Sequence, residues 1–206
     1  APSPRWGLAY MGLRATPSQR YNPGEGGVYF IHRGSMANNM PTGLKATSAH
    51  IAIGFSIDES AANTFTQGST DLNLSPLDYE VFVVTSINMD PTPPDNLGAI
   101  DTRVRTSLTT TSQTAAQDLS NTNCLASADI FSRGDALGAW MFHSQAEQPP
   151  ATLEYLGIIA TNDFFVQIIG DANLSSKKVT GKLYGYRARA TAAIYSALVQ
   201  SEVLSA

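Results

Sequence analysis

A short polar triplet, Gln145-Ala146-Glu147, follows an apolar run and precedes two prolines. Gln145 and Glu147 are two positions apart, so on an extended backbone their side chains project from the same face. An amide beside a carboxylate can hold a sugar hydroxyl and orient an incoming acceptor group. Gln145 and Glu147 are therefore candidate catalytic residues; the alternative is an ordinary polar strand edge before a turn. A second triplet of this type occurs at 200–202.

The composition favours one domain that buries a sizeable core. The chain has 206 residues and a net charge of -4, which argues against a large surface for binding phosphate backbones. Its apolar runs are too short for a membrane span. Cys124 is the one cysteine, so we expect either a buried thiol or a cysteine that pairs with another chain. Low lysine content and the Asn-x-Ser sequons at Asn73 and Asn173 favour a secreted protein.

Short β-favouring runs must position any such site. We expect strands at 6–14, 28–31, 50–57, 79–84, 153–159, 164–169 and 178–189, with 79–84 central because it is almost continuously apolar. Residues 58–65 begin like a short helix, and 190–204 have apolar residues at helical spacing. Residues 101–128 are rich in Thr, Ser, Gln and Asn, which predicts a surface segment that is partly helical at best. The resulting prediction is an α+β, β-rich fold with few helices.

Four motifs occur in a recognisable order: Leu13-Arg14-Ala15-Thr16, the stretch 26–35 from Gly26-Gly27 to Arg33-Gly34-Ser35, the strand and exit at 79–99, and Gln145-Ala146-Glu147. In this order they resemble the bacterial ADP-ribosyltransferase toxins of the cholera, heat-labile enterotoxin and pertussis type. The resemblance covers residues 6–160. It implies a split sandwich of two small sheets, forming a single catalytic domain over 1–206 with an inserted Ser/Thr-rich segment at 101–138.

The chemistry implied by the resemblance is cleavage of the nicotinamide–ribose bond of NAD through an oxocarbenium-like transition state. Glu147 would bind the ribose hydroxyl and stabilise the developing cation. Gln145 would position the acceptor, and Asn, Cys or a nucleic-acid base is favoured over Arg because a neutral amide cannot pair with or deprotonate a guanidinium as a carboxylate can. Arg14 would hold an NAD phosphate through paired hydrogen bonds; the alternative for Arg14 is a solvated strand-terminal cation.

The same resemblance gives roles to four further residues around the NAD substrate. Ser56 is the one serine left at the position of the family's Ser-Thr-Ser strand, and it would fix the side chain of Glu147. Tyr10 and Tyr29 would stack on nicotinamide or adenine, although strand aromatics are more often part of the core. Arg33 would assist at the phosphates, or be an ordinary turn residue.

Two functions from different classes follow. The first is a secreted mono-ADP-ribosyltransferase, a toxin or effector that uses NAD and modifies a host macromolecule, and the sequence leaves open whether it pairs with a separate delivery subunit. The second is a non-enzymatic β-sandwich, either a viral coat subunit or a lectin-like binding module, which the many short strands and the Thr/Ser-rich turns favour.

Overall fold

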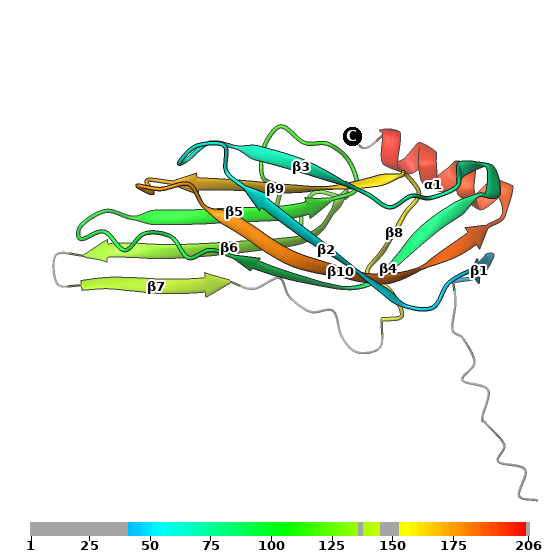
Figure 1. Cartoon of the computed structure of the whole chain (residues 1–206), viewed down its shortest axis with the longest axis horizontal. Helices are drawn as coiled ribbons and strands as arrows, with labels where there is room; N and C mark the ends of the chain where they lie inside the picture. Colours follow the sequence, from blue (N-terminus) through cyan, green and yellow to red (C-terminus); the bar gives the residue numbers. More distant parts are fainter. Residues whose placement is uncertain (1–40, 136–137, 145–152, 205–206) are drawn as a thin grey trace, which may run out of the picture. The chain divides into compact units, whose positions relative to one another are not determined.

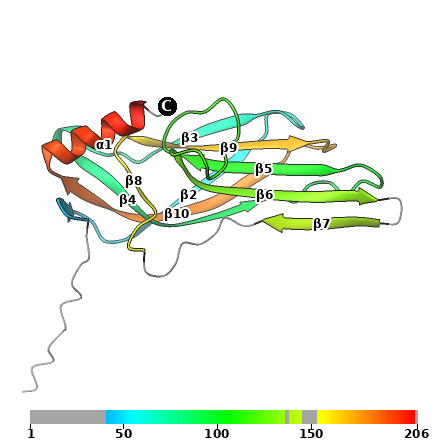
Figure 2. The same cartoon turned by 180° about the vertical axis from the view of Figure 1, so that it is seen from behind.

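The strands form two antiparallel five-stranded sheets, which Figure 1 and Figure 2 show from opposite sides. The computed structural model describes residues 41–135, 138–144 and 153–204, all within the unit 39–206. This confirms a β-rich fold with two small sheets, while the finer comparison with an ADP-ribosyltransferase stays a prediction.

Sheet A is built around the long C-terminal strand. It contains β1 (Leu44–Ala46), β2 (Ile51–Asp58), β4 (Glu80–Pro91), β8 (Gly157–Ile159) and β10 (Lys178–Ala190). One edge of β10 pairs with β4, and its other edge pairs with β2 and then β1. Strand β8 pairs with the far edge of β4, so β4 is central, as its apolar sequence predicted.

Sheet B has the order β3-β9-β5-β6-β7. Its strands are β3 (Thr66–Asp71), β5 (Thr102–Thr109), β6 (Cys124–Asp135), β7 (Gly138–Ser144) and β9 (Asp163–Asp171). All four pairings in this sheet are antiparallel.

The pairings between the two halves of the chain are nested. Strand β2 pairs with β10, β3 with β9, β4 with β8, and β5 with β6, so the chain runs out through four strands and returns beside them. Strands β2, β4, β8 and β10 lie in sheet A, and β3, β5, β6 and β9 lie in sheet B. This is the order of an eight-stranded jelly roll, to which β1 and β7 add edge strands.

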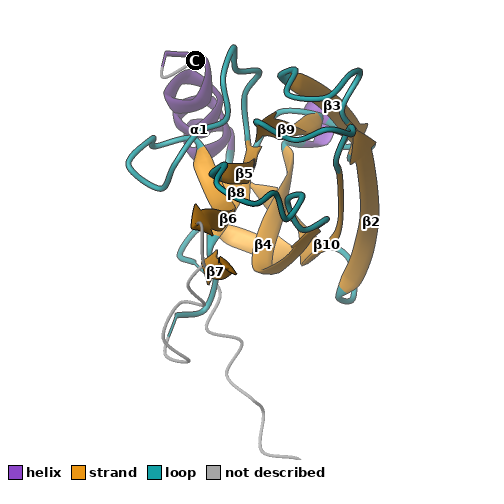
Figure 3. Cartoon of the chain, turned by 90° about the vertical axis from the view of Figure 1, so that its left-hand side faces the viewer, coloured by secondary structure: helices purple, strands orange, loops and turns teal. Residues whose placement is uncertain are grey.

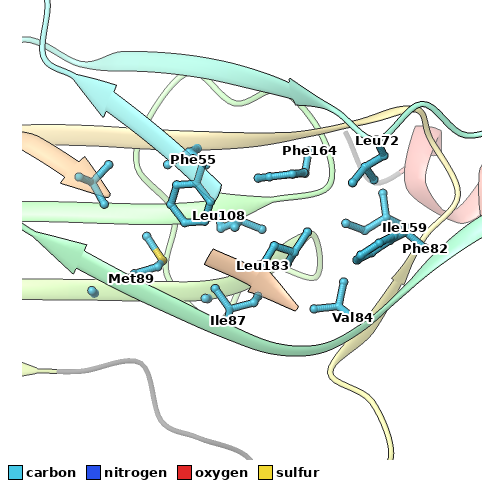
Figure 4. Packing of buried hydrophobic residues seen from close by; sticks show 14 of the residues in the cluster. Phe55, Leu72, Phe82, Val84, Ile87, Met89, Leu108, Ile159, Phe164 and Leu183 are labelled. Carbon is cyan, nitrogen blue, oxygen red and sulfur yellow. The ribbon is translucent and has the colours of Figure 1, made fainter. Parts of the chain in front are cut away.

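The two sheets share one hydrophobic core. Figure 3 views the two sheets end on. Figure 4 shows Phe82, Ile159 and Leu183 of sheet A near Phe164 and Leu108 of sheet B. Phe55 and Phe164 meet edge to face, with ring centroids 6.0 Å apart. Alternate residues on each strand supply this core, which is how a sandwich removes apolar area from water.

The opposite face of sheet A is covered in part by α1 (Ala192–Leu204). Val81 and Val83 point away from the main core and pack in a second apolar cluster, which the helix completes with Ile194, Tyr195, Leu198 and Val199. The carboxylate of Glu202 accepts hydrogen bonds from the backbone N–H groups of Ala160 and Thr161, both at 3.0 Å. The helix predicted at 190–204 is therefore confirmed as α1.

Two local predictions are wrong. Residues 59–65 form bends and a turn instead of the predicted helix. The carboxylate of Glu59 instead accepts hydrogen bonds from the backbone N–H groups of Gly170 and Lys177. Residues 101–128 contain all of β5 and the start of β6, in the middle of sheet B. Their Thr and Ser content misled the prediction because threonine suits strands and the loop between β5 and β6, within the same stretch, covers Ser107 on the outer face.

Candidate functional site

Six of the seven residues predicted for an NAD site lie outside the described residues: Glu147, Gln145, Arg14, Tyr10, Tyr29 and Arg33. Their roles stay predictions. Ser56 is the seventh and lies in β2, at the edge of sheet A.

Ser56 points to the outer face of sheet A, because its neighbour Phe55 points into the core. It is opposite Thr180 of β10, which is in turn opposite Asp90 of β4. All three contribute to an open polar surface on one sheet face. Among the described residues, the hydroxyl of Ser56 makes no side-chain hydrogen bond, so it is free to pair with a carboxylate or a ligand hydroxyl.

A cavity of about 140 Å³ lies on the outer face of sheet B. Its floor contains Arg103 and Arg105 of β5 and Ser127 and Asp129 of β6, and its wall contains Gln117 and Asp118 of the β5–β6 loop. We call this cavity the loop pocket. The alternation Arg103-Val104-Arg105 sends both arginines outwards, since Val104 is buried in the core between the sheets.

Of the two arginines in the loop pocket, Arg103 is in an ion pair with a described residue and Arg105 is not. Asp129 is opposite Arg105 in the strand register, yet its carboxylate is held by Arg103, whose Nε lies 2.8 Å and 3.0 Å from the two oxygens. This contact raises the pKa of Arg103. Hydrogen bonds from the hydroxyl and backbone N–H of Ser120 lower the pKa of Asp118. Among the described residues, no carboxylate forms an ion pair with Arg105.

The β5–β6 loop is held over sheet B by buried amides and hydroxyls. The side chain of Gln167 accepts a hydrogen bond from Ser107 at 2.8 Å and donates to Thr109 and Gln67 at 2.7 Å and 3.0 Å. The Ser107 hydroxyl then accepts the backbone N–H of Gln117, at 3.0 Å. Gln167 and Ser107 are fully buried, so each of these bonds avoids the cost of an unpaired polar group. The wall of the loop pocket is therefore fixed to its floor.

A second polar cluster, which we call the Asp95 cluster, ties together the β4–β5 and β9–β10 connections at the opposite end of the sheets. The Lys177 ammonium group, almost fully buried, lies 2.6 Å from the Asp95 carboxylate, which also accepts the backbone N–H of Leu174 at 2.8 Å. Asn173 accepts the backbone N–H of Asp95 and donates to the Arg103 carbonyl. These donors and acceptors satisfy one another, so we assign the cluster a structural role in holding the two connections together.

The remaining single residues can also be placed. Cys124 is buried, as one of the two alternatives predicted, and burial raises the pKa of its thiol to about 11. Asn173 is buried with its amide committed to carbonyls, so this sequon does not present an acceptor for glycosylation in the folded chain. Within 41–135, 138–144 and 153–204, no group of three or more His, Cys, Asp or Glu residues is placed to hold a metal ion.

The described helix is not long and apolar enough to span a membrane. The loop pocket was missed by sequence reasoning, although the alternation of Arg and apolar residues at 103–105 was a usable strand signal. Comparison of the sequence with known proteins finds no matching family model and no matching curated relative.

Proposed function

We propose that this chain is a coat subunit that assembles with copies of itself through the ends and edges of its jelly roll. The nested strand order carries the proposal, because jelly rolls with two sheets recur in viral coat subunits and in lectins. Since one fold serves many functions, a coat subunit must also have surfaces that can bind neighbouring copies of the chain.

Apolar side chains are exposed on loops at both ends of the strands. Leu174 is 77% exposed and Ile100 is 49% exposed at the end joined by the Asp95 cluster. Leu77 and Leu119 are exposed on connections at the other end, where β3 and β5 finish. Single exposed apolar residues are ordinary, but apolar residues at both ends give neighbouring subunits something to bury.

The edge of sheet B offers a second kind of contact. Strand β7 pairs with β6 on one side, and among the described residues no strand pairs with its other side. Such an edge has backbone N–H and C=O groups available to another strand. Phe142 on β7 is 71% exposed and adds apolar area at the same edge.

Sedimentation velocity and negative-stain electron microscopy, over a range of salt and pH, test the coat proposal. We expect large closed particles of uniform size. Leu174→Lys should shift the population towards free subunits without lowering the melting temperature, because the side chain is exposed. Ser56→Lys on the polar face of sheet A is the matched control and should still assemble. A chain that stays monomeric under every condition would overturn the proposal.

The order of the four sequence motifs favours a second candidate, the secreted NAD-dependent mono-ADP-ribosyltransferase. Glu147 would stabilise the ribosyl cation, Gln145 would position the acceptor, and Arg14 would hold a phosphate. Arg33, Tyr10 and Tyr29 would line the same substrate. This candidate requires Glu147 to lie within hydrogen-bonding distance of Ser56, on the outer face of sheet A.

Labelled NAD tests the enzyme candidate independently of assembly. We expect release of nicotinamide, or transfer of ADP-ribose to a protein or nucleic acid of a host extract, and loss of either activity in Glu147→Ala. The second triplet gives a control, since Gln200→Ala changes an exposed residue of α1 and should leave activity intact. Absence of hydrolysis and transfer in the unmodified chain would refute the candidate.

A further inference from the structure

We infer that the loop pocket binds a small acidic sugar, with the carboxylate of the sugar on Arg105 and its hydroxyls on the acidic side chains. This binding site goes beyond the coat function and does not depend on assembly. It follows from the size of the cavity, its charges and the rigidity of its wall.

The size of the loop pocket sets the class of ligand. A volume of about 140 Å³ equals that of roughly five water molecules in the liquid. A single sugar ring has about this bulk, whereas a dinucleotide is several times larger. The cavity is also predominantly polar, because arginine, aspartate, glutamine and serine side chains surround it. A small polar ligand therefore fits better than an apolar one.

The two arginines have different roles. Arg103 is already bound to Asp129, because its Nε–H is shared between both carboxylate oxygens and a terminal nitrogen donates to one of them, so this pair is a fixed part of the floor. Arg105 is exposed and has no ion-pair partner among the described residues. The planar guanidinium of Arg105 matches a carboxylate, which it can bind through two parallel hydrogen bonds.

The acidic residues distinguish an acidic sugar from a simple anion. One oxygen of Asp118 accepts two hydrogen bonds from Ser120, and its other oxygen can accept from a ligand hydroxyl. Asp129 has acceptor capacity in addition to its bonds with Arg103. Inorganic phosphate can also meet Arg105, but it has fewer hydroxyls than a sugar acid with which to reach both Asp118 and Asp129. A ligand with one carboxylate and several hydroxyls satisfies both kinds of group.

The wall of the loop pocket is rigid before any ligand binds. The backbone of Gln117 is bonded to the buried hydroxyl of Ser107, and the Gln117 side chain accepts a hydrogen bond from Asn121 at 2.9 Å. The Gln113 backbone donates to Gln67, which fixes the other end of the loop. A site held in this way loses little conformational entropy on binding, which favours measurable affinity for a small ligand.

Isothermal titration and saturation-transfer NMR with D-glucuronate, D-galacturonate and N-acetylneuraminate test the inference, with D-glucose and inorganic phosphate as comparison ligands. At least one sugar acid should bind, and Arg105→Gln should weaken it about tenfold or more, since a charge-assisted hydrogen-bond pair is lost. Arg133→Gln is the matched control, because Arg133 is an exposed arginine of β6 outside the cavity. Asp118→Asn should weaken the sugar acid but not phosphate.

Melting temperatures of the variants separate a loss of binding from a loss of folding. Arg105 and Asp118 are both exposed, so neither substitution should change the melting temperature by more than a few degrees. Four results would overturn the inference: no sugar acid binds, glucose binds as tightly as glucuronate, phosphate alone binds, or Arg105→Gln binds as tightly as the unmodified chain.

Discussion

The ion pair between Asp95 and Lys177 gives the sharpest test of how the connections at one end of the jelly roll are held. The Lys177 side chain is 4% exposed and the Asp95 side chain is 27% exposed. Asp95→Ala would leave a buried ammonium without its counter-ion and would also remove the acceptor for Leu174 N–H. Breaking a fully buried pair costs about 3–5 kcal/mol, and because water can reach Asp95 we expect about 2–4 kcal/mol.

A double-mutant cycle isolates the pair. Lys177→Met removes the buried charge and leaves the Asp95 carboxylate, which water can reach and which still accepts the Leu174 N–H, so it should cost less than Asp95→Ala. The double variant should be less destabilised than the sum of the single variants, with a coupling free energy of about 1–3 kcal/mol. Urea unfolding at neutral pH measures each value. The exposed pair Asp58–Lys178 is the control, and Asp58→Ala should change stability by less than about 1 kcal/mol.

The pH dependence has a definite sign. The hydrogen bond with Lys177 lowers the pKa of Asp95 in the folded chain. The stabilisation is therefore complete above the usual aspartate pKa of about 4 and is lost as the pH falls through the lowered folded value. The difference between unmodified chain and Asp95→Ala should stay constant from pH 7 to about 4 and shrink below that. Equal costs for Asp95→Ala and Asp58→Ala would refute the reasoning.

Three further outcomes test the packing and the buried titratable groups. Burial raises the pKa of Glu202 in the folded chain. The contribution of Glu202 to stability is therefore complete below the usual carboxyl pKa and is lost as the pH rises through the folded pKa. Glu202→Gln should remove this pH dependence from the free energy of unfolding. The Cys124 thiol, with its pKa raised to about 11, should react with Ellman's reagent at pH 8 only on unfolding, and rapid labelling of the native chain would contradict its burial. Phe164→Ala should cost about 3–5 kcal/mol in urea unfolding because the ring is fully buried between the sheets, and a cost below 1 kcal/mol would contradict that packing.

The sequence by itself determined the elements whose pattern is local. The apolar run at 79–84 predicted a central strand, and it forms part of β4 between β10 and β8. The run of Ala, Ile, Leu and Val at 190–204 predicted α1, whereas the face of this helix that packs on sheet A was set by the tertiary structure. The burial of Cys124 was one of two predicted alternatives, since a free cysteine is usually a small core residue.

Tertiary structure decided the rest, because the partners that settle it are far apart in the chain. Glu59 was taken for the start of a helix, yet its acceptors are used by Gly170 and Lys177, more than 100 residues later. The polar strand β5 became central once β9 and β6 paired with its two edges and a loop covered Ser107. The loop pocket exists only through this covering. Side-chain hydrogen bonding between distant strands leaves no periodic trace in either strand, so local pattern could not reveal it.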